Sequence, residues 1–425
     1  MEPKTAILIG AGARGARAYA PYALDNPHEL KMIAVAEPDN FRRNRFRDEH
    51  QLTEEHTFSS WENLLELGKI ADIAIICTQD REHFKPTIQA LELGYDVLLE
   101  KPMSPDPLEC IEMEKVAREN DCLLTICHVL RYTSFWTTIR DIIAKGTIGD
   151  VASIQLNENV EVMHMSHSFV RGNWNNKEES SPMILQKSCH DMDILSYIID
   201  EDCKRISSYG SLMHFNEENK PDGAPKRCLD GCPVANECPF HAGHYYLGKG
   251  RPWARHFTDD DSNESIIRAL QETDYGKCVY QSDNDVVDHQ VVNMEFSSGA
   301  TATFSMSGFT RDQTRDVQVM GTKGEIRGNM KDHSISVYDF LTNHETVINL
   351  DVSPSGHGGG DAGIIRTFLD ELNNGNTKTG RSSASVSLRS HLMAFAAETS
   401  RLEQGRSIDL EDYYEELTCQ LSSQV

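Results

Sequence analysis

The sequence predicts an α/β protein with a doubly wound parallel sheet first and an α+β domain with an open, largely antiparallel sheet after it. Through about the first 130 residues, short apolar runs alternate with helical stretches, which is typical of a parallel sheet. After about Arg140, strand-like stretches follow one another and are joined by hairpin turns. These observations divide the chain into residues 1–128, residues 129–360 with an insertion at about 203–280, and a helical segment at 361–425.

The bulk composition is that of a soluble globular protein. Hydrophobic residues make up 39% and charged residues 25% of the 425 residues. The formal net charge of −25 disfavours nucleic acid and anionic membranes as partners. The sequence shows no apolar run of membrane-spanning length and no signal-peptide pattern, and its 11 cysteines, an odd number, do not fit a secreted disulfide framework. We therefore expect a cytoplasmic protein.

The first predicted strand leads into a glycine-rich turn. The apolar run at residues 6–9 ends at Gly10, and Gly10, Gly12 and Gly15 spell G-x-G-x-x-G. The first glycine allows a tight turn, the second lets the backbone approach a pyrophosphate, and the third lets a helix at about 14–25 pack on the strand. This pattern predicts a dinucleotide site in which the pyrophosphate rests on the helix N-terminus.

A second strand, residues 32–36, ends at Glu37, about 20 residues past the glycines. A carboxylate at that place accepts hydrogen bonds from the adenosine ribose and would repel a 2′-phosphate, so it favours NAD over NADP. Arg42 and Arg43 could instead take such a phosphate, although we prefer to interpret them as a solvated helix face.

Three further buried strands are predicted at residues 71–77, 95–100 and 122–127, with helices between them. Ligands of parallel sheets bind beyond the carboxyl ends of the strands, which places Glu100 at the site. In the second region, hairpins are predicted for strands 291–296 and 300–306 and for strands 317–320 and 325–327.

Lys101 follows the strand end at Glu100 and precedes Pro102, which keeps the turn extended. A lysine there could donate a hydrogen bond to a substrate hydroxyl or share its proton. The alternative is an ordinary solvated lysine after a strand.

The stretch 188–193 opens a predicted helix in which His190 and Asp193 share a face. A histidine suits the role of base for an alcohol proton, and a carboxylate could orient it. The alternative is an ordinary helix start, in which Ser188 caps the helix and Asp191 completes a capping box.

Taken together, these motifs resemble the Gfo/Idh/MocA oxidoreductases, named for glucose–fructose oxidoreductase and inositol dehydrogenase. The motifs are GAGARG at 10–15, EKP at 100–102, His128-x-x-Arg131-Tyr132 and HDMD at 190–193, followed by DNDVVDHQ, GTKGEI and GHGGGD. The resemblance implies an NAD(P)-binding Rossmann domain and a C-terminal α/β domain whose open sheet often serves for oligomerisation, so we expect a homo-oligomer, a dimer or a tetramer. It also implies that Lys101 is the active-site lysine and His190 the catalytic histidine.

The sequence and the resemblance together predict the ligand-binding residues. The cofactor-binding residues are Gly10, Gly12, Ala13, Arg14, Gly15, Glu37, Thr78, His83, Glu100 and Lys101. The substrate-binding residues are His128, Arg131, Tyr132, Lys187, Asp193, Asp288 and His289.

The chain departs from the family pattern just before His190. The family commonly has an aspartate four residues before this histidine and a glycine between them, where this chain has Gln186 and Ser188. Lys187 stands beside them and is either a substrate-facing cation or a solvated side chain. We therefore expect substrate contacts that differ from those of inositol dehydrogenase.

Polar clusters in the second half of the chain have two interpretations each. Cys228, Cys232, Cys238 and His241 could hold a structural zinc ion, although the spacing is irregular and free thiols are the alternative. Asp283, Asp285, Asp288 and His289 could line a polyol site or form a polar loop. His357 in GHGGGD could contact substrate or belong to a glycine turn.

Three hypotheses for function follow. The favoured one is an NAD-dependent oxidoreductase that oxidises a secondary hydroxyl of a small-molecule sugar, glycoside or cyclitol to a ketone, with His190 as base and Lys101 bonded to the same oxygen. The resemblance also covers NAD-dependent glycosidases that work by transient oxidation, elimination, hydration and re-reduction. The third hypothesis is a non-catalytic NAD-binding sensor, against which the intact Lys101 and His190 count.

Overall fold

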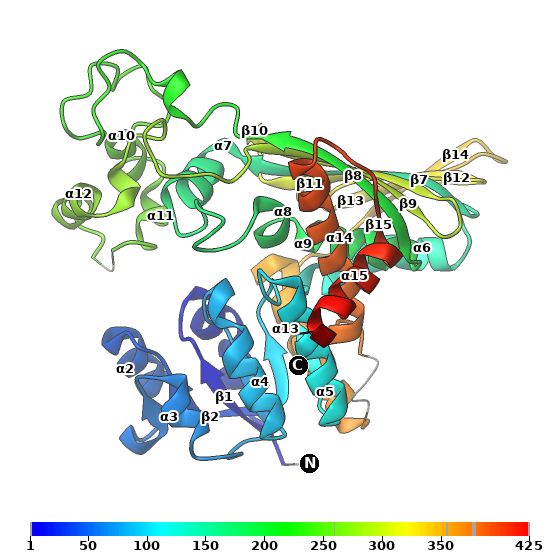
Figure 1. The fold of residues 1–425 in the computed structure, drawn as a ribbon, viewed down its shortest axis with the longest axis horizontal. Helices are drawn as coiled ribbons and strands as arrows, with labels where there is room; N and C mark the ends of the chain where they lie inside the picture. Colours follow the sequence, from blue (N-terminus) through cyan, green and yellow to red (C-terminus); the bar gives the residue numbers. More distant parts are fainter. Residues whose placement is uncertain (1, 259, 354–355, 376–379, 424–425) are drawn as a thin grey trace.

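The computed structural model describes residues 2–258, 260–353, 356–375 and 380–423. It contains a parallel sheet near the N-terminus and a larger mixed sheet above it (Figure 1). This confirms the predicted fold class. Among the described helices, none is long and apolar enough to cross a membrane.

The first sheet has six parallel strands in the order β3-β2-β1-β4-β5-β6. The strands are β1 (Lys4–Ile9), β2 (Leu30–Ala36), β3 (Thr57–Phe58), β4 (Ile73–Ile76), β5 (Asp96–Leu99) and β6 (Leu124–Ile126). Each predicted strand of this region is present. The order reverses between β1 and β4, so the crevice beyond their carboxyl ends is where ligands of such sheets bind.

Helices cover both faces of this sheet. They are α1 (Pro21–Asp25), α2 (Asn40–Glu49), α3 (Trp61–Leu65), α4 (Phe84–Glu92) and α5 (Pro107–Glu119), with the short η1 (Gly15–Tyr19), η2 (Glu54–His56) and η3 (Asp80–Glu82). The helix expected at 14–25 is divided, because η1 is a π-helical turn and Pro21 begins α1. Pro21 fits there since the first position of a helix needs no N–H donor.

The second sheet has nine strands in the order β14-β13-β12-β11-β7-β10-β9-β8-β15. They are β7 (Val151–Glu161), β8 (Cys203–Ser211), β9 (His289–Phe296), β10 (Thr301–Thr310), β11 (Thr314–Gly321), β12 (Gly324–Asn329), β13 (Ser334–Asp339), β14 (His344–Asn349) and β15 (Ile408–Asp409). All neighbouring strands are antiparallel except β10 and β7. Both predicted hairpins, β9–β10 and β11–β12, are confirmed.

The remaining helices connect and cover the two sheets. They are η4 (Val129–Tyr132), α6 (Ser134–Ala144), α7 (Val162–His164), η5 (Met165–Arg171), α8 (Met183–Gln186), α9 (Cys189–Ile199), η6 (Glu217–Asn219), α10 (Ala242–Tyr246), α11 (Arg251–Ala254), α12 (Asn263–Glu272), η7 (Asp274–Gly276), η8 (Met330–Asp332), η9 (Gly356–Gly359), α13 (Gly360–Asn373), α14 (Ala384–Leu402) and α15 (Leu410–Ser423). The segment expected as an insertion at 203–280 begins with β8, which is a strand of the sheet, so the irregular part starts only after Ser211.

The C-terminal helix α13 returns to the parallel sheet. Ile364 and Phe368 of α13 belong to the same buried cluster as Ala6 and Leu8 of β1, whereas Ile7 faces the other core. In Figure 1, α13 accordingly lies beside the lower, N-terminal sheet. Residues far apart in the sequence thus complete one face of the first domain.

Candidate active site

The glycine turn after β1 has the shape expected of a pyrophosphate cradle. Gly10 has φ +90°, and a Cβ there would lie 2.5 Å from the carbonyl oxygen of Cys77. A Cβ at Gly15 would lie 2.2 Å from the carbonyl oxygen of Gly10. A Cβ at Gly12 would meet no described protein atom within 4 Å. The first and third glycines are therefore required for packing, and the second faces open space, as the predicted approach of a pyrophosphate requires.

Glu37 is buried at the end of β2 and is fixed by two backbone donors. Its Oε2 accepts a hydrogen bond from Ala11 N at 2.7 Å and its Oε1 accepts one from Asp39 N at 3.0 Å. Arg43 donates to the carbonyl oxygens of Glu37 and Pro38. The carboxylate is thus held beside the glycine turn, and Arg43 is bound to the chain rather than free for a phosphate.

Two other residues predicted to bind the cofactor hold loops together. His83 is buried, its Nδ1 lies 2.7 Å from the carbonyl oxygen of Pro102, and its Nε2 lies 3.3 Å from that of Thr78. Thr78 donates its hydroxyl to the carbonyl oxygen of Glu82. These contacts tie the end of β4 to the turn after β5.

Arg14 points across the site to the C-terminal segment. It donates to Glu100 Oε1 at 2.5 Å and to Asp361 Oδ1 at 2.9 Å. His357 Nδ1 lies 2.9 Å from the same Asp361 oxygen. Burial opposes ionisation of Asp361, but the hydrogen bonds from His357 and Arg14 outweigh it and lower its pKa to about 2. The GHGGGD motif is therefore joined to the glycine turn by a charged network.

Lys101, which follows β5 of the first domain, forms a hydrogen bond to the second domain at the site. Its Nζ donates to the carbonyl oxygen of Gln186 at 2.7 Å, and its backbone N–H donates to Glu100 Oε2. An ammonium group has three donors, so two remain for other acceptors. The alternative of a freely solvated lysine is inconsistent with this contact.

His190 is 8% exposed at the start of α9, and its Nδ1 has no hydrogen-bond partner among the described residues. Its ring centroid lies 5.8 Å from that of His128 and 6.3 Å from that of His357. Burial and, after it, the charge of Lys101 hold the pKa of His190 well below its usual value. The imidazole is therefore neutral at ordinary pH and can accept a proton.

The ordinary helix start proposed as an alternative for this segment is wrong. Ser188 makes no side-chain capping hydrogen bond, and its hydroxyl has no partner among the described residues. Asp191 does not close a capping box but accepts two hydrogen bonds from Arg315, at 2.6 and 3.1 Å. Burial raises the pKa of Asp191 although Arg315 opposes the shift.

A buried charge network extends from Arg315 to Lys187. Arg315 Nη2 lies 2.7 Å from Glu158 Oε2, and Lys187 Nζ lies 3.2 Å from Glu158 Oε1. Gln313 donates to the same carboxylate at 2.8 Å. Burial lowers the pKa of Lys187, against the effect of Glu158. Lys187 is thus paired rather than solvated.

Arg131 and Asp193, predicted to contact substrate, contact each other. Arg131 donates to both carboxylate oxygens of Asp193 at 2.6 and 2.7 Å, and the two residues are 4% and 1% exposed. Tyr132 donates its hydroxyl to Ser382 at 2.9 Å. His128 is fully buried between His190 and His391. Arg131 thus fixes Asp193 on α9, the helix that carries His190, and the substrate contacts expected of these residues stay a prediction.

Hydrogen bonds and an ion pair within the protein hold the acidic loop before β9 in place. Asp288 is fully buried and accepts hydrogen bonds from His214 N at 2.7 Å and His289 Nδ1 at 2.8 Å. Asp283 pairs with Lys277 at 2.8 Å, and Asp285 accepts a hydrogen bond from Lys177 N at 2.8 Å. This geometry favours the interpretation of a polar loop over that of a polyol site.

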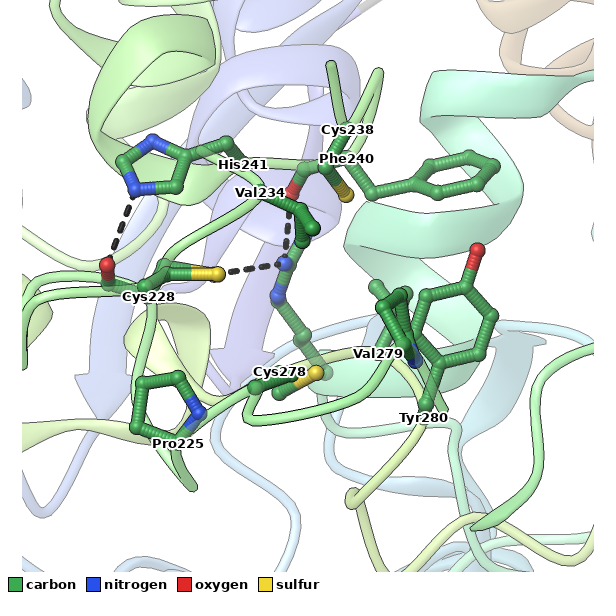
Figure 2. Close-up of a pocket in the computed structure, with 13 residues that line it drawn as sticks. Pro225, Cys228, Val234, Cys238, Phe240, His241, Cys278, Val279 and Tyr280 are labelled. Atoms are coloured by element: carbon green, nitrogen blue, oxygen red, sulfur yellow. Dashed lines mark hydrogen bonds between the residues drawn. The ribbon is translucent and has the colours of Figure 1, made fainter. Parts of the chain in front are cut away.

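The zinc hypothesis is not supported. Among the described residues, no group of three or more His, Cys, Asp or Glu is arranged to hold a metal ion. Both nitrogens of His241 are occupied, because Nε2 bonds to the carbonyl oxygen of Cys228 at 2.8 Å and Nδ1 accepts from His244 N at 3.2 Å. Arg171 Nη2 contacts Cys228 Sγ at 3.6 Å and donates to the carbonyl oxygen of Phe240 at 2.7 Å (Figure 2). The cysteine side chains therefore line a small cavity beside Arg171.

Several residues of the site carry no motif that would have identified them. Arg315 and Glu158 lie on strands β11 and β7 and are far in sequence from His190. Buried and exposed positions alternate along both strands, as in ordinary strands. The feature that would have identified these two residues is a charged side chain at a buried position.

The chain matches two family models. The model described as "Oxidoreductase family, NAD-binding Rossmann fold" matches residues 4–128, and the one described as "Oxidoreductase family, C-terminal alpha/beta domain" matches residues 140–387. The protein YteT of Bacillus subtilis (strain 168) is 23% identical over 361 residues, which cover 80% of this chain and 82% of that protein. The D-glucoside 3-dehydrogenase of Escherichia coli (strain K12) is 26% identical over 153 residues, or 35% of this chain and 42% of that protein.

Solved structures share the whole fold. A levoglucosan dehydrogenase in complex with NADH and levoglucosan has a TM-score of 0.72 at 15% sequence identity. The match covers 96% of this chain and 100% of that chain. An oxidoreductase from Agrobacterium radiobacter in complex with NAD+, L-tartaric acid and magnesium has a TM-score of 0.71 at 15% identity, with 96% and 99% covered. With both domains matched in order, the chain belongs to the Gfo/Idh/MocA family of oxidoreductases, with an NAD-binding Rossmann domain and a C-terminal α/β domain.

Proposed function

We propose that the protein is an NAD-dependent dehydrogenase that oxidises a secondary hydroxyl of a sugar, glycoside or cyclitol to a ketone. The observation that carries this proposal is the buried His190, with an unpartnered ring nitrogen, within the field of Lys101 at the domain junction. A neutral imidazole has a free lone pair that can take the proton of an alcohol, and a nearby cation stabilises the negative charge that then develops on the oxygen. The names of several relatives, such as D-glucoside 3-dehydrogenase, support the substrate class.

Each residue of the site has a separate role in the proposed reaction. His190 accepts the hydroxyl proton, and Lys101 donates a hydrogen bond to the same oxygen as negative charge develops there. When bound, NAD supplies the nicotinamide carbon that accepts hydride. The glycine turn at 10–15 holds the pyrophosphate, and the carboxylate of Glu37 accepts hydrogen bonds from the ribose hydroxyls. Arg131 and Asp193 fix the helix that carries His190.

The substitution Lys101→Met should lower kcat by roughly 10²–10³-fold, as removal of a donor to a developing oxyanion does. It should leave the Kd for NAD nearly unchanged, because the glycine turn and Glu37 stay intact. Steady-state kinetics and calorimetric titration with NAD would measure the two quantities. Full turnover in the variant would remove Lys101 from the reaction.

Glu37 should enforce the use of NAD. Because its carboxylate would face a 2′-phosphate, we expect kcat/KM for NAD to exceed that for NADP by roughly a hundredfold. Glu37→Ser should reduce this ratio at least tenfold, whereas Arg42→Ala on the exposed face of α2 should not change it. Equal use of both cofactors by the unmodified protein would contradict the assignment.

The reaction class is tested by one incubation with two readouts. The protein would be mixed with NAD and a panel of inositols, free sugars and aryl glycosides. Absorbance would follow nicotinamide reduction, and mass spectrometry would identify products. Stoichiometric NADH with a keto product is the expected result. The absence of any keto product would refute the dehydrogenase proposal.

A second candidate is the NAD-dependent glycosidase. The observation that favours it is the pair His357–Asp361, whose 2.9 Å contact gives the site a second histidine, with its ring centroid 6.3 Å from that of His190. Elimination and hydration need proton transfers at more than one atom, and two histidines could divide them. Released aglycone without net NADH in the same incubation would select this candidate.

A further inference from the structure

Four cysteines border one small cavity, which we call the cysteine cavity: Cys228, Cys232, Cys238 and Cys278. Its volume is about 10 Å³, and no Asp or Glu is among the described residues that line it. Figure 2 shows Cys228, Cys238 and Cys278 on different sides of this space. The first three cysteines lie close together in the sequence, and Cys278 joins them from a distant stretch.

Backbone hydrogen bonds bring Cys278 to Cys228. The backbone N–H of Cys228 donates to the carbonyl oxygen of Gly276 at 3.0 Å. The backbone N–H of Cys278 donates in turn to the carbonyl oxygen of Lys226 at 2.8 Å. The two stretches are thus paired side by side, so the main chain itself holds the distant cysteine at the cavity.

The other two cysteines lie on one compact turn. The backbone N–H of Cys238 donates to the carbonyl oxygen of Val234 at 2.9 Å, and that of Ala235 donates to the carbonyl oxygen of Cys232 at 3.2 Å. His241 follows this turn, but hydrogen bonds to backbone groups occupy both of its ring nitrogens. The available set of soft ligands is therefore four thiols rather than three thiols and a histidine.

The cysteine cavity also contains a buried cation, Arg171, which is 2% exposed. Its guanidinium donates to the carbonyl oxygens of Lys277 and Phe240, both at 2.7 Å, and its Nη2 lies 3.6 Å from Cys228 Sγ. Its Nη1 is buried and has no hydrogen-bond partner among the described residues. A buried charge is normally paired, so this guanidinium calls for negative charge in the cavity, which neutral thiols do not supply.

The space between the four cysteines distinguishes a metal cluster from a single metal ion. Thiolates around one zinc ion lie about 2.3 Å from it and leave no cavity between them. Here the cavity is about the size that a water molecule needs, and no described group of His, Cys, Asp or Glu is arranged for one ion. An iron–sulfur cluster places several irons and bridging sulfides between its cysteine ligands and so holds them farther apart.

An iron–sulfur cluster also fits the size and charge of the cavity. Iron bonds to a thiolate well inside van der Waals contact, so a cluster needs less free space than its own volume. A cluster with four thiolate ligands carries net negative charge, which the guanidinium of Arg171 would balance. Its sulfur atoms accept N–H hydrogen bonds, as Cys228 Sγ is placed to do from Arg171.

We propose that Cys228, Cys232, Cys238 and Cys278 are the four thiolate ligands of an iron–sulfur cluster that fills the cysteine cavity. Each thiol gives up its proton when it binds iron. Because the ligands come from two separate stretches, the cluster cross-links the long connection between β8 and β9. None of the four belongs to the proposed reaction site, so the proposal does not rest on the proposed function.

The test is a metal analysis of the full chain, produced in cells supplied with iron and purified without oxygen or chelator. We expect iron and acid-labile sulfide in equal amounts, about two or about four of each per chain. The visible absorption of the cluster should bleach on reduction with dithionite. Cys238→Ser and Cys278→Ser should each lower the iron content to about a tenth or less of that of the unchanged protein.

The control is Cys419→Ser, which removes an exposed cysteine on α15 and should keep the full iron and sulfide content. The Kd for NAD would show whether the first domain of each variant is folded. One zinc ion per chain, iron without sulfide, or no bound metal in the unchanged protein would overturn the proposal. Full iron content in a Cys278→Ser protein would overturn it as well. If that variant does not fold, the iron and sulfide content of the unchanged protein decides.

Discussion

Replacement of His190 by asparagine should lower kcat by about 10²–10⁴-fold, the range expected for the loss of a general base. Asparagine fills nearly the same space at the start of α9 but cannot take up a proton. The Kd for NAD should change little, since the dinucleotide contacts lie on the first domain. Steady-state kinetics at saturating NAD would measure the effect, with a Kd for NAD as the test of folding.

The pH profile supplies a second readout for His190. Because burial and Lys101 lower its pKa, the base stays deprotonated, and the acid limb of kcat/KM should lie below the ordinary histidine value of about 6.5. Lys101→Met removes the cation, which should raise the pKa of His190 and move the acid limb to higher pH. An acid limb that does not move would show that another group titrates, and an active His190→Asn variant would exclude His190 as the base.

Replacement of Arg131 by methionine should destabilise the protein by about 3–5 kcal/mol, because it leaves the carboxylate of Asp193 buried without its partner. The pair is almost fully buried and bidentate, so water cannot replace the lost guanidinium. Urea unfolding followed by tryptophan fluorescence would report the loss, since Trp136 is fully buried on the neighbouring α6.

Two variants complete this experiment. Arg131→Met combined with Asp193→Leu should recover part of the stability, because no unpaired charge remains. Arg327→Met breaks an exposed pair with Glu325 and should cost less than about 1 kcal/mol. An Arg131→Met protein of normal stability but raised KM would instead restore the prediction that Arg131 contacts substrate.

The first domain was predictable because its signals are local. The run at 6–9, the three glycines and Glu37 lie in consecutive elements, and each has one steric or electrostatic reason for its place. The crowding around Gly10 and Gly15 and the open space at Gly12 match those reasons one by one. The hairpins of the second sheet were predictable on the same ground, since a turn and its two flanking strands occupy one short stretch.

The inner arrangement of the site was not predictable, because it depends on contacts across the whole chain. Asp191 looks like a capping residue in sequence, and only the position of Arg315, 124 residues later, shows that it belongs to an ion pair. Arg131 and Asp193 are predicted as substrate ligands, and nothing in the sequence signals that they form a buried pair with each other. The spacing of His241 and the cysteines is compatible with a metal site, but both ring nitrogens of His241 form hydrogen bonds to backbone groups.

The return of α13 to the parallel sheet has a consequence for synthesis of the chain on the ribosome. The face of β1 that carries Ala6 and Leu8 is completed by Ile364 and Phe368. The nucleotide-binding domain is therefore translated early, but the part of its core that α13 covers can close only after Phe368 has been translated. Until then the apolar patch under α13 is open to solvent, so we expect nascent chains of this protein to bind chaperones through their first domain.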